Sequence, residues 1–225
     1  MLLCETRLCL PERRQPADAM RLPDMLLLTS KGGVMAANVL ARSARAASGL
    51  SQSDLSSRSG VAGSSLSLIE HGKREPLVTT LDALLRATRH SIVTVPTVRS
   101  DAAHIASEIS DATEASDDAV AFRRFLQLAD NLAAERGATR VGLTLTEPAP
   151  TGSGHWDAAI AALCEYRLTS DDLPVPDWVA ARTGNPEDSW APRSSVYDIP
   201  ADPARVPAAF LRRGILIESA TLESV

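Results

Sequence analysis

Residues 51–76, SQSDLSSRSGVAGSSLSLIEHGKREP, place several hydroxyl side chains ahead of two cations. Ser64, Ser65 and Ser67 stand close together, and Lys73 and Arg74 follow them. A hydroxyl can both donate and accept hydrogen bonds, as the polar edge of a base requires, whereas Lys and Arg bind phosphate oxygens. These residue types suit contacts with phosphates and base edges if the surrounding elements present them on one face. The alternative is that the serines merely solvate an exposed helix.

Other groupings that could carry chemistry are incomplete. The chain's two lysines are Lys31 and Lys73, so its later part has no Ser–Lys dyad, and no H-E-x-x-H zinc motif occurs. His104 and His155 are too few for a cluster of metal ligands. GSGHWD (residues 152–157) puts a Ser, a His and an Asp close together, but adjacency is not triad geometry. This motif predicts a loop and a helix start, and we expect no enzyme activity, no cofactor and no metal.

Composition places the chain among globular proteins. Its 225 residues suffice for one large domain or two small ones, and 44% hydrophobic residues can build a core. Cys4, Cys9 and Cys164 form no paired framework, which indicates a reducing, cytoplasmic setting. No apolar run reaches the roughly 18 residues that a membrane span needs. All four methionines lie in the first 35 residues, so residues 1–34 are expected to be disordered or an upstream-start extension.

Charge is distributed unevenly along the chain. Residues 36–95 carry seven Lys/Arg against four Asp/Glu, or +3, whereas residues 96–225 carry eleven against twenty, or −9. None of the eight aromatic residues lies in 36–95, so this segment lacks the stacking platform of single-strand binders. Duplex DNA as partner of the first segment and a protein as partner of the second would fit this asymmetry. Ordinary surface charge would fit it equally.

Two helices around a glycine turn are predicted within residues 51–72. Ser51 caps the first of them, and Asp54 completes a capping-box pair. Gly60 ends it, because a left-handed residue is least costly as glycine, and Gly72 ends the second. Their inward side chains are expected to be Leu55, Val61, Leu66 and Ile69.

A helix is predicted on each side of this pair. The preceding one covers about residues 36–48, and the following one begins after Pro76 and bears Leu77, Leu81, Leu84 and Leu85. This arrangement is the core of a helix-turn-helix domain, in which the second helix of the pair enters the major groove. A generic helical hairpin would not need Gly60 together with the small Ser56 and Ser59 before it.

The stretch LARSARAASGLSQSDLSSRSGVAGSSLSLIEHGKREP resembles the XRE family of helix-turn-helix regulators, which are similar to lambda repressor and Cro. The GLSQ entry to the pair, the SGV turn, the IEHGKREP exit and the leucine-rich fourth helix match in order, over about residues 36–89. The resemblance implies that Gln52 touches the DNA backbone and that Lys73 and Arg74 meet phosphates. It also implies that Ser64, Ser65 and Ser67 face the groove and that Gly63 belongs to the DNA-binding set.

Three positions depart from the family pattern. Ala62 stands where a capping Ser or Thr is frequent. The missing capping hydrogen bond costs about 1 kcal/mol of stability. Gly63 replaces a long polar residue, and Leu68 replaces a polar or basic one. Serine lacks the bidentate base contact of Arg or Gln, so each subunit is expected to read sequence modestly. A homodimer or a bound partner would supply the rest.

The segment after residue 95 is predicted to be a mostly helical acidic module. Helices are expected at about residues 102–112, 122–133, 155–168 and 207–213. Residues 91–96 are expected to form a short strand or an extended exit from the first segment, and 140–146 a strand. The expected fold class is therefore mainly α: a lambda-repressor-like helix-turn-helix bundle over 35–95, followed by a helical dimerisation or partner-binding module over 96–225.

LPVPDWVAARTG and PAAFLRRGILIESATLESV in this module are similar to actinobacterial antitoxins paired with a nucleotidyltransferase-like toxin. This looser resemblance implies a DNA-binding antitoxin that represses its own operon and binds the toxin. The alternative is an interaction protein that neutralises a partner and docks only weakly on DNA. Candidates for partner contact, unless they are core residues, are Trp178, Trp190, Phe210, Ile215 and Ile217.

Overall fold

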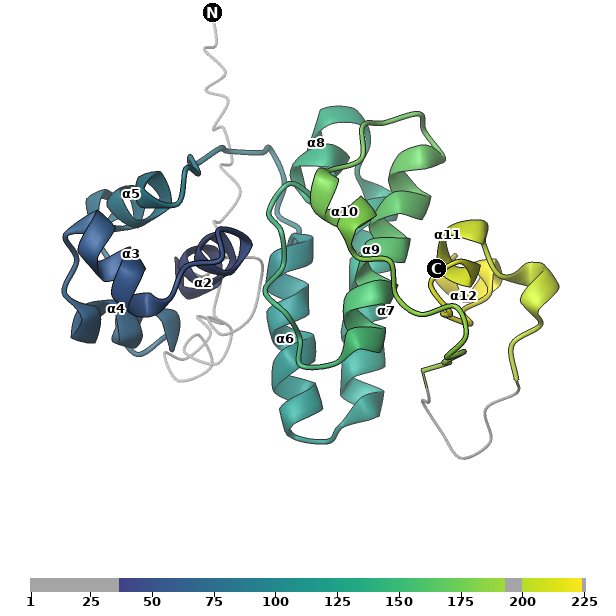
Figure 1. Ribbon diagram of the computed structural model, residues 1–225. Helices are drawn as coiled ribbons and strands as arrows, with labels where there is room; N and C mark the ends of the chain where they lie inside the picture. The colour runs from purple at the N-terminus through teal and green to yellow at the C-terminus, as the bar shows by residue number, and fades with distance from the viewer. Residues whose placement is uncertain (1–36, 193–199, 224–225) are drawn as a thin grey trace, which may run out of the picture. The chain divides into compact units, whose positions relative to one another are not determined.

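The computed structural model describes residues 37–192 and 200–223. Over these residues the chain forms eleven α-helices and one 3₁₀ turn, and its only β pairing is an isolated bridge between Trp190 and Ile215 (Figure 1). The expected mainly α fold class is confirmed. The expectation for residues 1–34 lies outside the described residues.

The first four described helices form a small bundle. Their bounds are α2 (Ala37–Ala47), α3 (Gln52–Ser59), α4 (Gly63–Glu70) and α5 (Val78–Ala87). Each follows a local signal: Gly49 takes φ 63° after α2, Gly60 takes φ 72° after α3, and Gly72 takes φ 66° after α4. At the start of α3 the Ser51 side chain accepts from the Asp54 amide, and the Asp54 carboxylate accepts from the Ser51 amide. The predicted capping box is confirmed.

The bundle has its own apolar core. Leu55, Leu66 and Ile69 are buried, and Val61 packs against them, as their spacing predicts. Ala41 and Leu84 complete the cluster. One expectation here is wrong: Leu77 is 75% exposed. It precedes α5 as an extended residue with φ −63° and ψ 151°, so it does not share the helical periodicity of the other leucines.

A second group of helices follows. Its elements are α6 (Ala102–Glu114), α7 (Asp118–Ala134), α8 (Gly137–Gly142), α9 (Gly154–Thr169), α10 (Asp177–Ala181), the 3₁₀ turn η1 (Pro203–Arg205), α11 (Ala208–Leu211) and α12 (Ser219–Leu222). In Figure 1 α6 and α7 lie side by side, and both contact α9. The helices predicted at 102–112, 122–133, 155–168 and 207–213 are all present.

Helix α9 is buried more completely than its sequence pattern predicts. Trp156, Ile160 and Leu163 form the expected apolar stripe, but every residue from Ala158 to Cys164 is buried. Helices α6, α7, α10 and α11 all contact α9. The alanines between its larger side chains allow this close approach from several sides, so α9 is a core helix.

Of the two alternatives for residues 91–96, the strand is absent and the exit segment without regular structure remains, whereas the strand predicted at 140–146 is wrong. Residues 91–96 contain neither helix nor strand, and 140–146 contain the end of α8 and a turn. A strand needs a partner to satisfy its backbone groups, and the described residues offer none beside either segment. Arg140 is instead buried and donates from Nε to the Glu135 carbonyl at 2.8 Å and from Nη1 to the Arg167 carbonyl at 2.9 Å.

The apolar candidates for partner contact are mostly core residues. Trp178 is 7% exposed, Phe210 and Ile215 are fully buried, and Ile217 is 3% exposed. Trp190 is half-buried, and its ring packs edge-on against Trp156 with centroids 4.9 Å apart. These side chains hold the acidic module together, so four of the five offer no surface to a partner.

Candidate nucleic-acid interface

The turn between α3 and α4 is held by two serine side chains. Ser56 Oγ donates to the Val61 carbonyl at 2.7 Å, and Ser59 Oγ donates to the Leu55 carbonyl at 2.7 Å. Ser59 Oγ also accepts from the Val61 amide at 3.3 Å. Ser56 also lies close to α4, because a Cβ added at Gly63 would be 3.7 Å from its Oγ. The turn therefore orients α4 through local hydrogen bonds as well as through the core beneath it.

Helix α4 has one buried face and one exposed face. Leu66, Ile69 and Glu70 are buried. Successive side chains on an α-helix differ by about 100°, so Ser64 and Leu68 point most directly away from the core, and both are exposed. Ser65 and Ser67 flank this line and are half-buried. The outward surface of α4 is thus one serine and one leucine with a serine on each side.

The beginning of α4 has no side-chain cap. Ala62 is the N-cap residue, and it makes no capping hydrogen bond. The first turn consists of Gly63, Ser64 and Ser65, of which Gly63 and Ser64 are exposed. Amides in the first turn of a helix have no intrahelical acceptor and attract anions. The absence of a cap leaves these amides for solvent or for a phosphate oxygen.

The end of α4 fixes the backbone of the two predicted phosphate contacts. Gly72 adopts the left-handed conformation, and its amide donates to the Ile69 carbonyl at 2.9 Å. The Lys73 and Arg74 amides both donate to the Leu68 carbonyl, at 2.9 and 3.2 Å. This pattern is a Schellman motif. It ties the backbone of both cations to α4 while their side chains remain exposed.

Arg74 also reaches back to α4. Its Nη1 donates to Ser65 Oγ at 3.0 Å, so these two predicted DNA contacts are coupled. The guanidinium carries five N–H donors in a fixed fork, which leaves donors for an oxygen of a ligand.

Glu70 at the other face of α4 joins three helices. Its carboxylate accepts from Arg45 Nε at 2.7 Å and Nη2 at 3.0 Å, and from Gln52 Nε2 at 2.7 Å. The Glu70 side chain is 3% exposed and the Arg45 side chain 20%. This cluster connects α2, the start of α3 and the end of α4. It holds Gln52 by one amide hydrogen and leaves the other free to donate.

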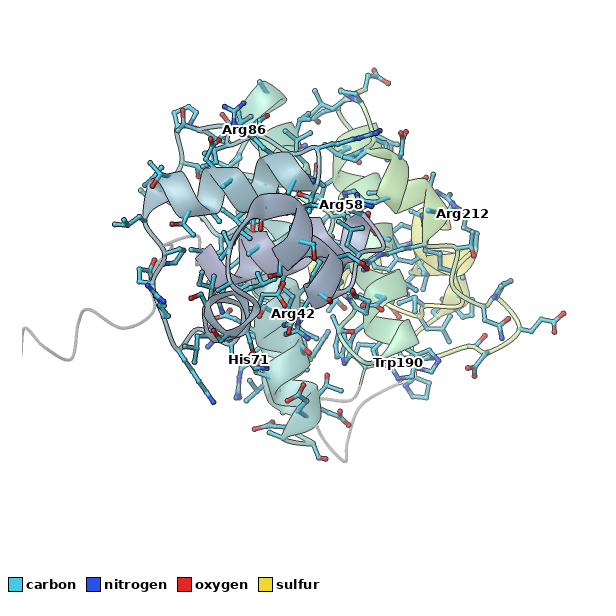
Figure 2. The ribbon with its side chains drawn as sticks, turned by 60° about the vertical axis from the view of Figure 1, so that its left-hand side comes forward. Arg42, Arg58, His71, Arg86, Trp190 and Arg212 are labelled. Atoms are coloured by element: carbon cyan, nitrogen blue, oxygen red, sulfur yellow. The ribbon has the colours of Figure 1, made fainter. Side chains whose placement is uncertain are left out.

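Further arginines and one histidine lie on the same bundle. The exposed side chains of Arg42 and Arg58 project from α2 and α3, and His71 lies at the end of α4 (Figure 2). Arg86 on α5 pairs with Asp82 at 2.7 Å. Hydrogen bonds from Ser51 hold the pKa of Asp54 below its usual value, which keeps that carboxylate ionised in its cap. The bundle combines its basic surface with hydroxyls on α4.

GSGHWD does not assemble a triad. Ser153 caps α9, where its Oγ accepts from the Trp156 amide, and Asp157 accepts from the Thr151 amide at 2.9 Å. His155 Nε2 lies 3.0 Å from Asp188, and its ring stacks on Trp190. The predicted loop and helix start is confirmed. No group of three metal-ligating side chains occurs among the described residues.

A hollow of about 850 Å³ opens in the acidic module. Its lining includes Phe122, Trp156, Trp190, Asp118 and Glu218. Two of its lining residues, Pro192 and Pro200, border the undescribed segment 193–199.

The predicted DNA contacts gather around one helix. Gly63, Ser64, Ser65 and Ser67 belong to α4, Lys73 and Arg74 follow its Schellman motif, and Gln52 begins α3 and bonds to the last residue of α4. Leu68 also lies on the exposed surface of α4, but the sequence-based predictions gave it no DNA contact. The signal for it was present, because Leu68 is four residues after Ser64 and therefore shares its face.

Comparison with known proteins agrees with this geometry. Residues 42–92 match the family model described as helix-turn-helix, which spans most of α2, the whole of α3, α4 and α5, and five residues beyond. Searches of curated proteins and of solved structures return no match. The chain therefore carries an XRE-type helix-turn-helix domain, the DNA-binding domain of transcription regulators. No helix among the described residues is long and apolar enough to cross a membrane.

Proposed function

We propose, from the helix-turn-helix domain in residues 42–92, that the chain is a sequence-specific repressor acting on its own promoter. The observation that carries this proposal is the exposed face of α4, which a turn, a core and a Schellman motif hold in place. In such domains this helix enters the major groove of duplex DNA. The helix-turn-helix pair is therefore the DNA-binding element, and residues 35–95 form its domain.

The proposed contacts divide into two classes. Ser64, Ser65 and Ser67 face base edges, where a hydroxyl can donate or accept a single hydrogen bond. Gly63 has no side chain and offers only its backbone amide at the start of α4. Gln52, Lys73 and Arg74 bind phosphates, Gln52 through the amide hydrogen that Glu70 does not engage. The first class sets sequence preference, and the second sets register and overall affinity.

Serine contacts alone discriminate weakly, because the stronger base contacts are bidentate. The proposed repressor therefore binds as a homodimer on two half-sites, so that two modest readouts combine. Residues 96–225 supply the dimerisation or partner surface of this proposal. The net charge of −9 in that segment favours a basic partner.

We further propose that the chain is the antitoxin of a toxin–antitoxin pair, whose partner is a nucleotidyltransferase-like toxin and whose action is in the cytoplasm. The support is the resemblance of the acidic half to such antitoxins. Co-purification of the full chain with the product of the adjacent gene tests this part. Recovery of the chain alone, with that product expressed in the same cells, would exclude it.

The DNA-binding part is tested on the fragment upstream of the coding sequence. The wild type is expected to shift this fragment, with an affinity that falls steeply as salt rises. Replacing Lys73 and Arg74 with Ala is expected to weaken binding to all sequences and to reduce the slope of log K against log[salt] by about 1.8 for each subunit, or about 3.6 for the dimer. The control replaces Arg123 and Arg205, which are exposed and lie outside the helix-turn-helix bundle, and should leave the slope unchanged. An unshifted fragment at low salt, with the partner present, would refute autoregulation.

A second candidate function is partner neutralisation with only weak DNA docking. The uncapped start of α4 and its serine surface favour it, since both limit the readout of sequence. The full-length Lys73→Ala, Arg74→Ala variant separates the two candidates. If this variant still protects cells from the toxin, neutralisation does not depend on DNA binding.

A further inference from the structure

We propose that Leu68 is a specificity-determining residue that reads thymine through apolar contact with its C5 methyl group. The inference rests on the DNA-binding function proposed above and names the base that α4 prefers. The observation behind it is an exposed leucine in the middle of the surface that faces the groove.

Leu68 occupies that surface because of helix geometry. Leu66, Ile69 and Glu70 are buried on one side of α4, and the opposite direction falls between Ser64 and Leu68. Leu68 is 43% exposed. A helix that enters the major groove with this side outward places the Leu68 side chain against base edges.

The backbone of Leu68 is also held firmly. Its carbonyl accepts from the amides of Lys73 and Arg74 at 2.9 and 3.2 Å. If those two side chains bind phosphates, Leu68 lies at a set depth relative to the DNA backbone. The same motif therefore positions both the cations and the leucine.

The chemistry of the side chain selects the base. Leucine has no hydrogen-bonding atom, so it cannot satisfy the acceptors of guanine or the donor of cytosine that it would desolvate in the groove. Thymine is the base that presents an apolar group there, its C5 methyl. The neighbouring Ser64 and Ser67 hydroxyls remain available to polar edges, and Ser65 keeps its hydroxyl hydrogen while its oxygen accepts from Arg74. Leu68 thus adds selectivity where the serines are weak.

The test compares thymine with uracil, which lacks only the methyl group. The full-length wild type selects duplexes from a random-sequence library, and the enriched duplex is then made with uracil in place of thymine at one position at a time. Each half-site should contain one position at which the loss of the buried methyl group weakens binding about fourfold. Uracil at that position in both half-sites of the same duplex should weaken binding about 16-fold.

Two variants assign the effect to Leu68. Leu68→Ala should bind the thymine and uracil forms equally, at about the wild-type affinity for the uracil form. Leu77→Ala, which shortens a more exposed leucine outside α4, should keep the wild-type preference. The wild-type comparison needs no variant, so it stands whatever the substitutions do to folding.

The outcomes separate this inference from the function on which it rests. If the wild type binds the thymine and uracil versions of the duplex equally at every position, the role of Leu68 is overturned and the DNA-binding proposal stays intact. A preference that persists in Leu68→Ala would do the same, because another group would then be reading the methyl. A library from which nothing is enriched would overturn sequence-specific binding and this inference with it.

Discussion

Glu70 shows how one buried side chain serves a surface that it does not touch. Its carboxylate accepts three hydrogen bonds, two from Arg45 and one from Gln52. A buried carboxylate is tolerated only when it is paired and hydrogen-bonded, and this one meets both conditions. Gln52 is held in the same cluster, so a predicted DNA contact depends on a residue of the core.

Replacing Glu70 with Ala should destabilise the helix-turn-helix bundle. The change leaves Arg45 and Gln52 without their acceptor, and removing one partner of a buried pair costs about 3 kcal/mol. Water that reaches the partly exposed Arg45 limits the loss to no more than that figure. Urea unfolding followed by far-ultraviolet circular dichroism measures the change in the free energy of unfolding.

The matched control is Glu75→Ala, which removes an exposed carboxylate from the same segment. Its free energy of unfolding should stay within about 0.5 kcal/mol of the wild-type value. If the two variants were equally stable, the three-helix cluster would contribute nothing measurable.

Helix caps distinguish two neighbouring elements. Helix α3 begins with a reciprocal capping box, whereas α4 begins at Ala62 with no side-chain cap. The Ala62 backbone has φ −55° and ψ 136°, which suits an N-cap residue. The helix that faces DNA in the proposed function is thus the one whose first-turn amides remain uncapped.

Ala62→Ser should restore the cap and raise the free energy of unfolding by about 1 kcal/mol. Ala47→Ser provides the control, because it places the same residue at the exposed last position of α2, where its hydroxyl cannot cap the start of a helix. Urea unfolding of both variants gives the comparison. A stability gain shared by both variants, or absent from Ala62→Ser, would contradict the capping argument.

Asp101 caps α6, and burial of its carboxyl group makes its contribution to folding stability depend on pH. Its carboxylate accepts from the His104 amide at 2.8 Å, and burial raises its pKa above the usual value of 3.8. A carboxyl with a raised folded-state pKa favours folding below the unfolded-state pKa, and this contribution is lost as pH rises through the folded-state pKa. The ionised form is therefore the less favourable one in the folded protein.

Asp101→Asn keeps an acceptor oxygen for the cap and removes this titration. The variant should gain stability relative to the wild type as pH rises from below 4 to 7. Free energies of unfolding, measured for both proteins across that range, provide the test. A difference that is constant with pH, or that falls as pH rises, would show that burial does not control this carboxyl.

At the scale of the whole molecule, the described residues contain two apolar clusters. One lies within α2–α5, and the other joins α6, α7 and α9 to the last helices. All three tryptophans belong to the second cluster or pack against it. Tryptophan fluorescence therefore follows the acidic module, whereas circular dichroism follows both groups of helices.

Cys164 offers a chemical probe of the second cluster. It is fully buried, and burial raises the pKa of its thiol to about 12. Because the thiolate is the reactive form, alkylation at pH 8 in a Cys4→Ser, Cys9→Ser background should be at least about 10³-fold slower than in the unfolded chain. Labelling followed by mass spectrometry measures the rate.

Adding Glu70→Ala to that background should leave the Cys164 labelling rate unchanged if residues 35–95 and 96–225 are separate domains. Leu163→Ala, which opens the second cluster directly, serves as the positive control and should accelerate labelling. Acceleration by Glu70→Ala would show that the two clusters unfold together.

Local signals were sufficient for the helix-turn-helix domain. The capping box at Ser51, the glycine stops and the spacing of Leu55, Leu66 and Ile69 lie within a few residues of the structure that they specify. Such signals can be interpreted without knowing what packs on them, and their order identified the type of domain. The missing cap at Ala62 was equally visible in the sequence.

The features that tertiary structure decided depend on distant neighbours. Glu70 and Arg45 are 25 residues apart in the chain, and no pattern near either predicts their contact. The β-branched residues of 91–96 resemble a strand, but strand formation depends on a partner that the described residues do not provide. Burial of α9 on several sides was likewise settled by the helices around it. The sequence by itself determined the DNA-binding element, because its signals are local. Only the tertiary structure decided how that element is held, through the cluster of Glu70, Arg45 and Gln52, because these residues lie far apart in the chain.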